Sequence, residues 1–368
     1  MKSFYVIVQT TLACNMRCKH CYEEGQNNNA FVMSESTLEN LIKKLQKEFD
    51  SVRYLWFGGE PHLAGLDFFK KAIYFQNKYK RKNTTIENSI QTNGLLLNDS
   101  FLNFFKENDF KVSVSYDGPS DAFVRDSGDI VFKRIIKAKG FFPGIGILST
   151  IHKYNFTKQI EMYNFFRDGE FNFKFNRIFL TKNHNSKDWL IDNKEYLEYQ
   201  KEFFMYWLHD KKGVLFSPFS DYVRLILNHK TRSCENTGCL YRWLSVSPSG
   251  DIFPCTRIFD DEYNVGNIND VNLITEVFDT QKYQQIVKKS IVRRKQCLSD
   301  CELYYYCNGG CNAMSINETS LDKSGTQYCE FNKGFIPFVK KTIEDLQNNI
   351  NEYDDINPGV LALINKAK

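Results

Sequence analysis

Three cysteines near the start of the sequence have the spacing of a metal-binding loop. Cys14, Cys18 and Cys21 form a C-x3-C-x2-C run that follows the apolar segment 4–8. Three thiolates this close together can bind three corners of a cubic [4Fe–4S] cluster and leave one iron open. A zinc site would need a fourth protein ligand from elsewhere in the chain. The loop by itself therefore leaves three alternatives: a cluster, a zinc knuckle or three buried thiols.

The other eight cysteines lie in the C-terminal part of the sequence. Eight thiolates suffice for two fully ligated [4Fe–4S] clusters, although the two C-x3-C pairs, 297–301 and 307–311, would also suit the halves of a zinc ribbon. Because disulfides are rare in a reducing compartment, such clustered spacings favour metal ligation. Three and eight account for all 11 cysteines of the chain. The eight are Cys234, Cys239, Cys255, Cys297, Cys301, Cys307, Cys311 and Cys329.

The N-terminal loop resembles the signature of the radical S-adenosylmethionine (SAM) enzymes. In that superfamily SAM chelates the open iron and is cleaved to a 5′-deoxyadenosyl radical, so the resemblance implies that the three loop cysteines are the catalytic ligands. Gly58, Gly59, Glu60 and Pro61 resemble the motif that binds the SAM amino group. Glycines let main-chain carbonyls approach an ammonium, and Glu60 adds a carboxylate.

The same resemblance implies further SAM contacts at the ends of two later strands. In peptide-modifying members, the serine that matches Ser115 bonds the SAM ribose or carboxylate. Arg134 or Lys137 is the rough positional match for a cation that holds the carboxylate, with a surface helix cation as the alternative. His20 occupies a position often filled by an aromatic residue near the adenine, where it could instead shield the cluster. The implied SAM contacts are Gln91, Asn93, Ser115, Arg134, Lys137 and His20.

The C-terminal cysteines resemble the SPASM domain, the auxiliary-cluster module of many radical SAM enzymes that modify peptides. The x3 spacing between Cys297 and Cys301 departs from the usual x2, and a loop can absorb the extra residue. All 11 thiols would then be ligands, so none would remain to donate a hydrogen atom to a substrate radical. The auxiliary clusters would instead carry away an electron. The implied ligand sets are Cys234, Cys239, Cys255 and Cys311 for one cluster, and Cys297, Cys301, Cys307 and Cys329 for the other.

Alternating strand and helix patterns surround these motifs. Six strand–helix units imply a parallel sheet with right-handed crossovers, curved into a full or partial barrel with its chemistry at the carboxyl ends of the strands. A capping box at Ser36-x-x-Glu39 predicts the start of the first helix. Strands are expected at 4–9, 53–57, 87–92, 111–115, 145–150 and 171–178, and helices at 36–49, 66–79, 98–107, 131–139, 157–167 and 194–209.

The predicted fold class is α/β. It combines a partial (β/α)6 TIM-like barrel (1–215), a small cysteine-rich α+β SPASM domain (216–329), and a C-terminal helix and tail (330–368). The boundary is placed where helices are expected to shorten and turn residues increase. A net charge of +4 favours neither nucleic acid nor a membrane as partner. No apolar run approaches the ~18 residues of a membrane span, so we expect a cytoplasmic protein.

The motifs together predict an oxidoreductase that uses three [4Fe–4S] clusters and SAM to oxidise or crosslink a ribosomally made precursor peptide, through a C–C or thioether bond. A small-molecule dehydrogenase is one alternative, although that class usually has a shorter C-terminal module. A formylglycine-forming sulfatase maturase is the other. In that class an aspartate follows the cysteine that matches Cys255 and acts as base. Thr256 stands here, and its hydroxyl cannot take a proton near neutral pH, so Asp260 or Asp261 would have to substitute.

The expected partners follow from the same interpretation. The first strand begins near Phe4, so no leader-binding element is expected before it. Recognition of the peptide would then fall to the barrel mouth, the C-terminal region or a separate leader-binding protein. An external flavodoxin- or ferredoxin-like donor would supply the electron for SAM cleavage.

Overall fold

The chain forms two compact units, and each unit is built from two separate segments. The first unit comprises Met1–Leu148 and Leu240–Lys288, and the second comprises Ser149–Cys239 and Lys289–Lys368. This division cuts across the domains 1–215, 216–329 and 330–368, which stay a prediction. The computed structural model describes residues 2–22, 31–119, 124–125, 128–181, 186–228, 233–236, 239–258, 260–348 and 355–367.

Parallel strands form the centre of the first unit, in the order β5-β4-β3-β2-β1-β7-β8-β9. Pairing is parallel from β5 to β7 and antiparallel between β7, β8 and β9. The parallel sheet confirms the α/β fold class. The extension β7–β9 was not predicted, because strands of two to four residues are too short to show a periodic pattern. The strands are β1 (Ser3–Thr11), β2 (Ser51–Gly58), β3 (Thr85–Thr92), β4 (Lys111–Ser115), β5 (Gly146–Ile151, which continues into the second unit), β7 (Trp243–Val246), β8 (Asp251–Phe253) and β9 (Gly266–Asn267).

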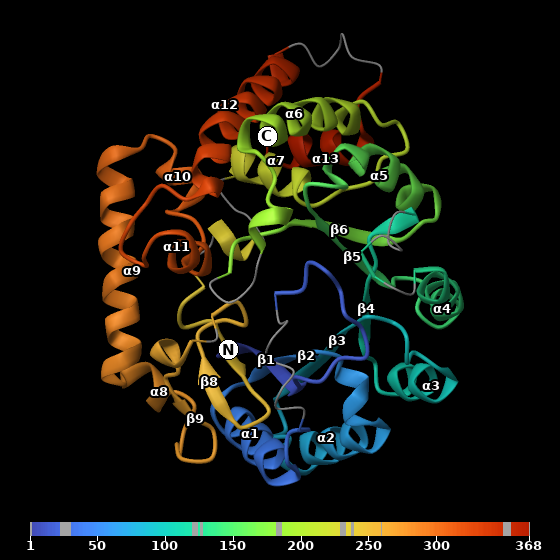
Figure 1. Cartoon of the computed structure of the whole chain (residues 1–368), viewed down its shortest axis with the longest axis vertical. Coiled ribbons are helices and arrows are strands. Elements are labelled where there is room, and N and C mark those ends of the chain that lie inside the picture. The colour runs from blue at the N-terminus through green and yellow to red at the C-terminus, as the bar shows by residue number, and fades with distance from the viewer. Residues whose placement is uncertain are drawn as a thin grey trace. The chain divides into compact units, whose positions relative to one another are not determined.

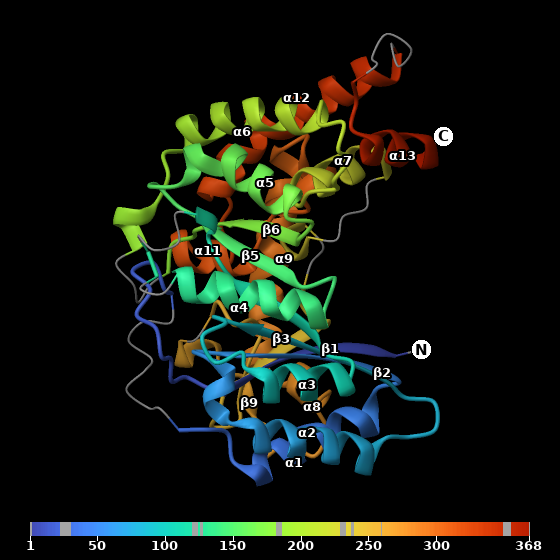
Figure 2. The same ribbon diagram turned by 90° about the vertical axis from the view of Figure 1, so that its right-hand side faces the viewer.

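Helices α1 and α2 lie side by side along the strands β1–β3 (Figures 1 and 2). The predicted apolar face of α1 is confirmed, since Leu38, Leu41, Ile42 and Leu45 are fully buried. The predicted capping box is wrong. The helix begins earlier, and the Ser34 side chain caps it by accepting from the Thr37 N–H at 3.1 Å. The helices of this unit are α1 (Glu35–Glu48), α2 (Leu66–Tyr79), α3 (Asp99–Glu107), α4 (Gly128–Phe141), α8 (Glu276–Asp279) and the start of α9 (Gln281–Asp300), with 3-10 turns at Pro61–Ala64 and Asp261–Tyr263.

The second unit is mainly helical around β6 (Asn172–Arg177), which follows the end of β5. Its helices α6, α7 and α12 lie close together (Figure 1). They meet through a cluster of aromatic rings that includes Phe203, Phe204, Phe219 and Phe335. Such rings bury large apolar areas and hold the helices together. The helices are α5 (Gln159–Asp168), α6 (Asn193–Leu208), α7 (Phe219–Asn228), the rest of α9, α10 (Tyr304–Cys307), α11 (Asn312–Glu318), α12 (Gln327–Asn348) and α13 (Pro358–Ala367), with 3-10 turns at Phe156–Lys158, Ser186–Trp189 and Cys234–Asn236.

The expectation that helices shorten after residue 216 is wrong for α9, which has 20 residues. The C-terminal helix expected from residue 330 is confirmed as α12, which has 22 residues and continues through Pro337. A buried stripe that includes Phe331, Phe335 and Val339 explains the length of α12, because tertiary packing outweighs one unfavourable residue. The tail also contains a helix, α13, where only a tail was expected.

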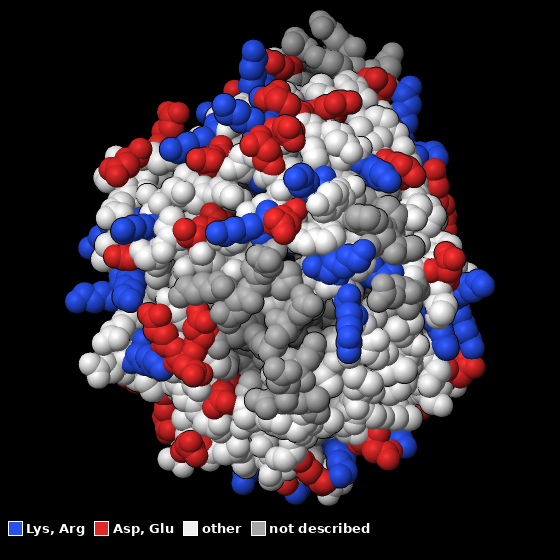
Figure 3. All heavy atoms as spheres, viewed as in Figure 1, with Lys and Arg blue, Asp and Glu red and all other residues white. Residues whose placement is uncertain are grey.

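Charged side chains of both signs are mixed over the visible face of the molecule (Figure 3). This matches the small net charge of +4. Among the residues described, no helix combines the length and the apolar character that crossing a membrane requires.

Candidate functional site

The cysteine loop lies at the carboxyl end of β1, as expected for a site on a parallel sheet. Strand β1 ends at Thr11, and Cys14, Cys18 and Cys21 follow within ten residues, each partly exposed. A hydrogen bond from the Cys21 N–H to the Cys18 carbonyl (3.1 Å) closes the end of the loop. The three thiols are therefore presented by one short segment of chain.

The glycine pair at the end of β2 is joined directly to the cysteine loop. The Gly59 N–H donates to the Thr11 carbonyl at 3.0 Å, and the Glu60 N–H donates to the Ala13 carbonyl at 2.7 Å. A Cβ at Gly58 would lie 2.2 Å from the Thr11 oxygen, and one at Gly59 would lie 2.3 Å from the Ala13 oxygen. Gly58 also has a φ of +130°, which residues with a Cβ rarely adopt. Both glycines are thus required by the backbone contact itself.

Glu60 has several hydrogen-bond partners within the protein, and its contact with SAM stays a prediction. Its side chain is fully buried and accepts four hydrogen bonds, from the His62 N–H (3.1 Å), His62 Nδ1 (2.7 Å), Thr92 Oγ1 (2.8 Å) and the Asn93 N–H (2.7 Å). Four donors use the acceptor sites that a carboxylate offers. Glu60 therefore ties the ends of β2 and β3 together. Pro61 begins the following 3-10 turn, and its carbonyl accepts from Thr10 Oγ1 at 3.4 Å.

Two of the predicted SAM-contact positions lie against each other, and a third reaches the cysteine loop. Asn93 Nδ2 donates to Asn15 Oδ1 at 2.7 Å and lies 3.7 Å from Cys14 Sγ. Gln91 Nε2 donates to Ser115 Oγ at 2.9 Å, which joins the ends of β3 and β4. The structure therefore brings Asn93 to the thiols and pairs Gln91 with Ser115, while their contacts with SAM stay a prediction.

A charged group that the sequence analysis did not identify lies beside Cys18. Arg125 is 7% exposed, and its Nη1 lies 3.7 Å from Cys18 Sγ. Its Nε donates to Asp117 Oδ2 at 3.2 Å, and His20 Nε2 is 3.8 Å from the same carboxylate oxygen. His20 and Asp117 are also buried. Asp117 was visible at the end of the predicted fourth strand, but nothing in the local sequence indicated that Arg125 would reach the thiol.

The two cations proposed for the SAM carboxylate have other partners in the structure. Arg134 Nη1 donates to the Leu97 carbonyl at 3.3 Å. Lys137 Nζ pairs with Asp99 Oδ1 at 2.5 Å, and both side chains are largely exposed. These contacts correspond to the surface-cation alternative, so a SAM contact for either residue stays a prediction.

Four cysteines of the second unit lie close enough to influence one another. Burial and, to a smaller extent, the neighbouring Cys297, Cys329 and Cys301 together raise the pKa of Cys307 to about 11. The Cys297 pKa is likewise raised by burial, and Arg293 lowers it. Thiols with raised pKa values hold their protons near neutral pH unless a metal displaces them. The set predicted for the second auxiliary cluster is therefore gathered within one unit.

The set predicted for the first auxiliary cluster is distributed differently. Cys234, Cys239 and Cys311 belong to the second unit, whereas Cys255 belongs to the first. Among the residues described, no three His, Cys, Asp or Glu side chains converge on a point where one metal ion could bind. Each thiolate of a cubic cluster binds a different iron, so the sulfurs of such a site need not converge. The ligand sets themselves stay a prediction.

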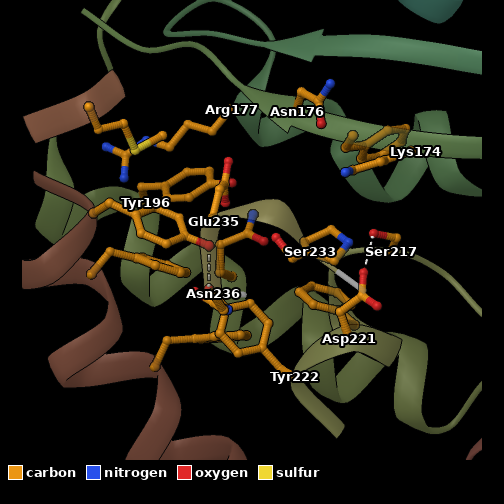
Figure 4. Close-up of a pocket in the computed structure, with 18 residues that line it drawn as sticks. Lys174, Asn176, Arg177, Tyr196, Ser217, Asp221, Tyr222, Ser233, Glu235 and Asn236 are labelled. Carbon is orange, nitrogen blue, oxygen red and sulfur yellow. Dashed lines mark hydrogen bonds between the residues drawn. The ribbon is translucent and has the colours of Figure 1, made fainter. Parts of the chain in front are cut away.

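A hollow with a cavity volume of about 60 Å³ lies within the second unit. Its walls come from β6, α6, α7, α12 and the 3-10 turn Cys234–Asn236. The Arg177 guanidinium lies over the Tyr196 ring at 4.3 Å. Figure 4 shows Glu235, Tyr196 and Arg177 gathered on one side of the hollow, and Ser217 hydrogen-bonded to Asp221 on the other. The hollow thus combines aromatic walls with polar groups, and its lining includes Ser233 and Glu235, the chain neighbours of Cys234, a predicted cluster ligand.

Two family models match the chain. Residues 8–164 match the radical SAM superfamily, and residues 234–312 match SPASM, an iron–sulfur cluster-binding domain. The chain is therefore a radical SAM enzyme that carries a SPASM domain. Its cofactors are SAM, the [4Fe–4S] cluster of the radical SAM domain and the auxiliary clusters of the SPASM domain. The residues described above fit the first cluster, because three thiols share one loop and N–H donors lie near two of the sulfurs.

Relatives with assigned roles resemble this chain over nearly its whole length. The cysteine-type anaerobic sulfatase-maturating enzyme of Clostridium perfringens (strain 13 / Type A) is 27% identical, over 94% of this chain and 98% of the relative. The serine-type enzyme of Bacteroides thetaiotaomicron is 25% identical, over 98% and 97%.

Solved structures are also similar to this chain over most of its length. The structure of native anSMEcpe with bound AdoMet and Cp18Cys peptide has a TM-score of 0.85 and 26% identity, over 95% of this chain and 99% of that one. Streptococcus suis SuiB bound to S-adenosylmethionine shares the fold, with a TM-score of 0.68 and 17% identity, over 89% and 77%. Among these relatives are enzymes that mature a protein.

Proposed function

We propose that this enzyme oxidises a side chain of a ribosomally made peptide by two electrons and closes a C–C or thioether bond. The observation that carries the proposal is the similarity over 95% of the chain to a maturase that binds both AdoMet and a peptide. The alternative of a small-molecule dehydrogenase has no comparable support among these relatives. The relatives with assigned roles are sulfatase-maturating enzymes, so they act on a protein.

The chemistry begins at the cysteine loop of the first unit. When bound, the cluster and SAM together supply a 5′-deoxyadenosyl radical, which takes a hydrogen atom from the substrate side chain. Gly58 and Gly59 allow the loop to lie against the end of β2, and Glu60 fixes the end of β3 beside it. Asn93 and Arg125 direct N–H groups toward Cys14 and Cys18, where they stabilise thiolate charge.

The electron balance of the proposed reaction requires two electron carriers. SAM cleavage consumes one electron from an external flavodoxin- or ferredoxin-like donor. Loss of a hydrogen atom leaves a substrate radical, and ring closure then releases one proton and one electron. The auxiliary clusters, held by the cysteines of the SPASM domain, would supply an acceptor for that electron. With all 11 cysteines assigned as ligands, no thiol would remain as a hydrogen-atom donor, and the proposed ring closure uses none.

The hollow of the second unit is the proposed place for part of the peptide. Its walls include Tyr196, Tyr222, Tyr328 and Phe331, and such rings suit an apolar or aromatic side chain. Burial raises the pKa of Tyr222 well above its usual value, so its hydroxyl stays protonated and donates to Asn332 Oδ1 at 2.8 Å. Ser233 and Glu235, the chain neighbours of Cys234, line the hollow, so a substrate radical held there would lie near a predicted cluster ligand. A separate leader-binding protein would act outside this hollow.

Formation of formylglycine is the second candidate, favoured by the sulfatase-maturating relatives. Position 256 argues against it. Thr256 is 8% exposed and carries a hydroxyl where the resemblance requires a carboxylate base. Asp261, offered as a substitute, is exposed on a 3-10 turn, where its backbone carbonyl accepts from Lys282.

The test compares two kinds of substrate. Anaerobically reconstituted enzyme is incubated with SAM, a reductant and either a cysteine-containing sulfatase peptide or short peptides encoded beside the gene. We expect a loss of two hydrogen atoms in one of the latter, measured by mass spectrometry together with 5′-deoxyadenosine. Conversion of the sulfatase cysteine to an aldehyde would instead establish the second candidate. Cleavage of SAM that no peptide stimulates would contradict both.

A further inference from the structure

A fully buried arginine in the second unit lacks an acidic partner. Arg293 lies in α9, one turn before Cys297, and is 0% exposed. Its Nη2 donates to Asn312 Oδ1 at 2.6 Å and to the Gly310 carbonyl at 3.4 Å. Its Nε and Nη1 have no hydrogen-bond partner, and no carboxylate among the described residues forms an ion pair with it. A guanidinium stays charged in proteins, so burying one without an anion carries a large free-energy cost.

The groups around Arg293 are predicted ligands of both auxiliary clusters. Burial and the neighbouring Arg294 lower the Arg293 pKa, and the thiols of Cys311, Cys297 and Cys239 raise it. Asn312, which accepts from Arg293, directs its Nδ2 toward Cys239 Sγ at 3.7 Å. Ser290 Oγ also donates to Asn312 Oδ1, at 2.8 Å, and so fixes the orientation of that amide. The anions available to Arg293 are therefore the cluster thiolates.

We infer that Arg293 is the shared counter-charge of the two auxiliary-cluster ligand sets and that it makes these clusters easier to reduce. Each added electron makes a cluster more negative, and a fixed cation nearby stabilises the reduced form. Arg293 touches neither substrate nor reacting atoms, so it is a positioning residue. The inference concerns the auxiliary clusters and does not depend on which peptide is modified.

The test removes the charge while keeping most of the side-chain volume. Arg293→Met is prepared as anaerobic holoenzyme in a background with Cys14, Cys18 and Cys21 changed to Ala, so that only auxiliary clusters contribute to the spectrum. Iron content and an EPR-monitored redox titration are measured. We expect full auxiliary iron and a more negative midpoint potential, with the ratio of reduced to oxidised cluster at a fixed potential falling about tenfold.

Two further variants separate charge from structure. Lys295→Met removes a charge from the same helix at an exposed position, where solvent screens it, and should leave the midpoint unchanged. Arg293→Lys keeps the charge without the planar fork and should retain iron and most of the potential. An unchanged midpoint in Arg293→Met with full iron would overturn the inference. If Arg293→Met loses its iron, Arg293→Lys decides: retained iron and potential support the charge role, and loss of iron there as well contradicts it.

Discussion

The two cysteine regions of this enzyme are built in opposite ways. In the first unit, three thiols lie within eight residues, and backbone hydrogen bonds from Gly59 and Glu60 hold the segment that leads into them. In the second unit, the thiols come from segments as distant as Cys239 and Cys329, and side chains such as Asn312 connect them. A site that exchanges SAM needs an open loop with one vacant iron, whereas an electron-transfer site can be enclosed. The difference teaches that local sequence gathers the N-terminal thiols, whereas tertiary packing gathers the C-terminal ones.

The two cysteine regions also differ in whether the arginine near their thiols is paired with a carboxylate. Arg125 beside Cys18 is paired with Asp117 at 3.2 Å, so the cation is largely compensated. Arg293 near Cys239, Cys297 and Cys311 has no described carboxylate in contact. A compensated site keeps a cluster strongly reducing, which SAM cleavage requires, and an uncompensated cation favours accepting an electron. Three changes test this comparison.

The largest effect is expected from replacing Cys14, Cys18 and Cys21 together with Ala. Formation of 5′-deoxyadenosine should be abolished, because no thiolate remains to hold the catalytic cluster. The auxiliary clusters should persist, because their ligands come from other segments, so roughly two thirds of the iron should remain if three four-iron clusters are present. Iron analysis and chromatography of the reaction measure both. Continued SAM cleavage would contradict the assignment, and loss of all iron would show that the regions do not load independently.

A smaller but still large effect is expected from Gly59→Ala. The added Cβ would lie 2.3 Å from the Ala13 carbonyl oxygen and 2.4 Å from that of Leu12, so the cysteine loop must shift. Displacement of a catalytic loop by about 1 Å reduces rates on the order of 10²-fold, measured here as 5′-deoxyadenosine formation. Gly140→Ala is the matched control, because it lies in α4 with no atom within 4 Å of the new Cβ. The control should keep a normal rate and should stabilise the enzyme by about 0.5–1 kcal/mol. A normal rate in Gly59→Ala would contradict the requirement for close contact between Gly59 and the segment that leads into the cysteine loop.

The smallest effect is expected from Asp117→Asn, which leaves the Arg125 charge uncompensated beside Cys18. The midpoint potential of the catalytic cluster should rise, so the reduced cluster becomes a weaker donor to SAM, and SAM cleavage should slow by up to about tenfold when an excess of strong reductant keeps the cluster fully reduced in both proteins. Asp99→Asn is the control, since its pair with Lys137 is exposed and contributes little. A redox titration and the cleavage rate check the result. Equal values for Asp117→Asn and the wild type would remove the charge difference from the comparison.

Much of the fold could be predicted because its elements are long and periodic. Leu66–Tyr79 and Lys111–Ser115 have the predicted bounds, since a helical stripe and a buried strand are marked by residues within them. The cap of α1 was misplaced because Ser34 and Ser36 are both good caps, and only the backbone decides between them. The strands β7–β9 were missed because each is stabilised by pairing with another segment, as β7 is with β1.

The candidate site also has one part that the sequence indicated and another that depends on tertiary contacts. The sequence by itself determined the ligand loop, because chain connectivity holds three cysteines together over eight residues whatever the rest of the fold does. Only the tertiary structure decided that Glu60 joins two strands, that Asn93 reaches Cys14 across 79 residues, and that Arg125 reaches Cys18 across 107. The same holds for Arg293, whose burial between distant thiols no local pattern indicates. Such contacts depend on which strand and helix ends the fold brings together, and side-chain periodicity does not encode that choice.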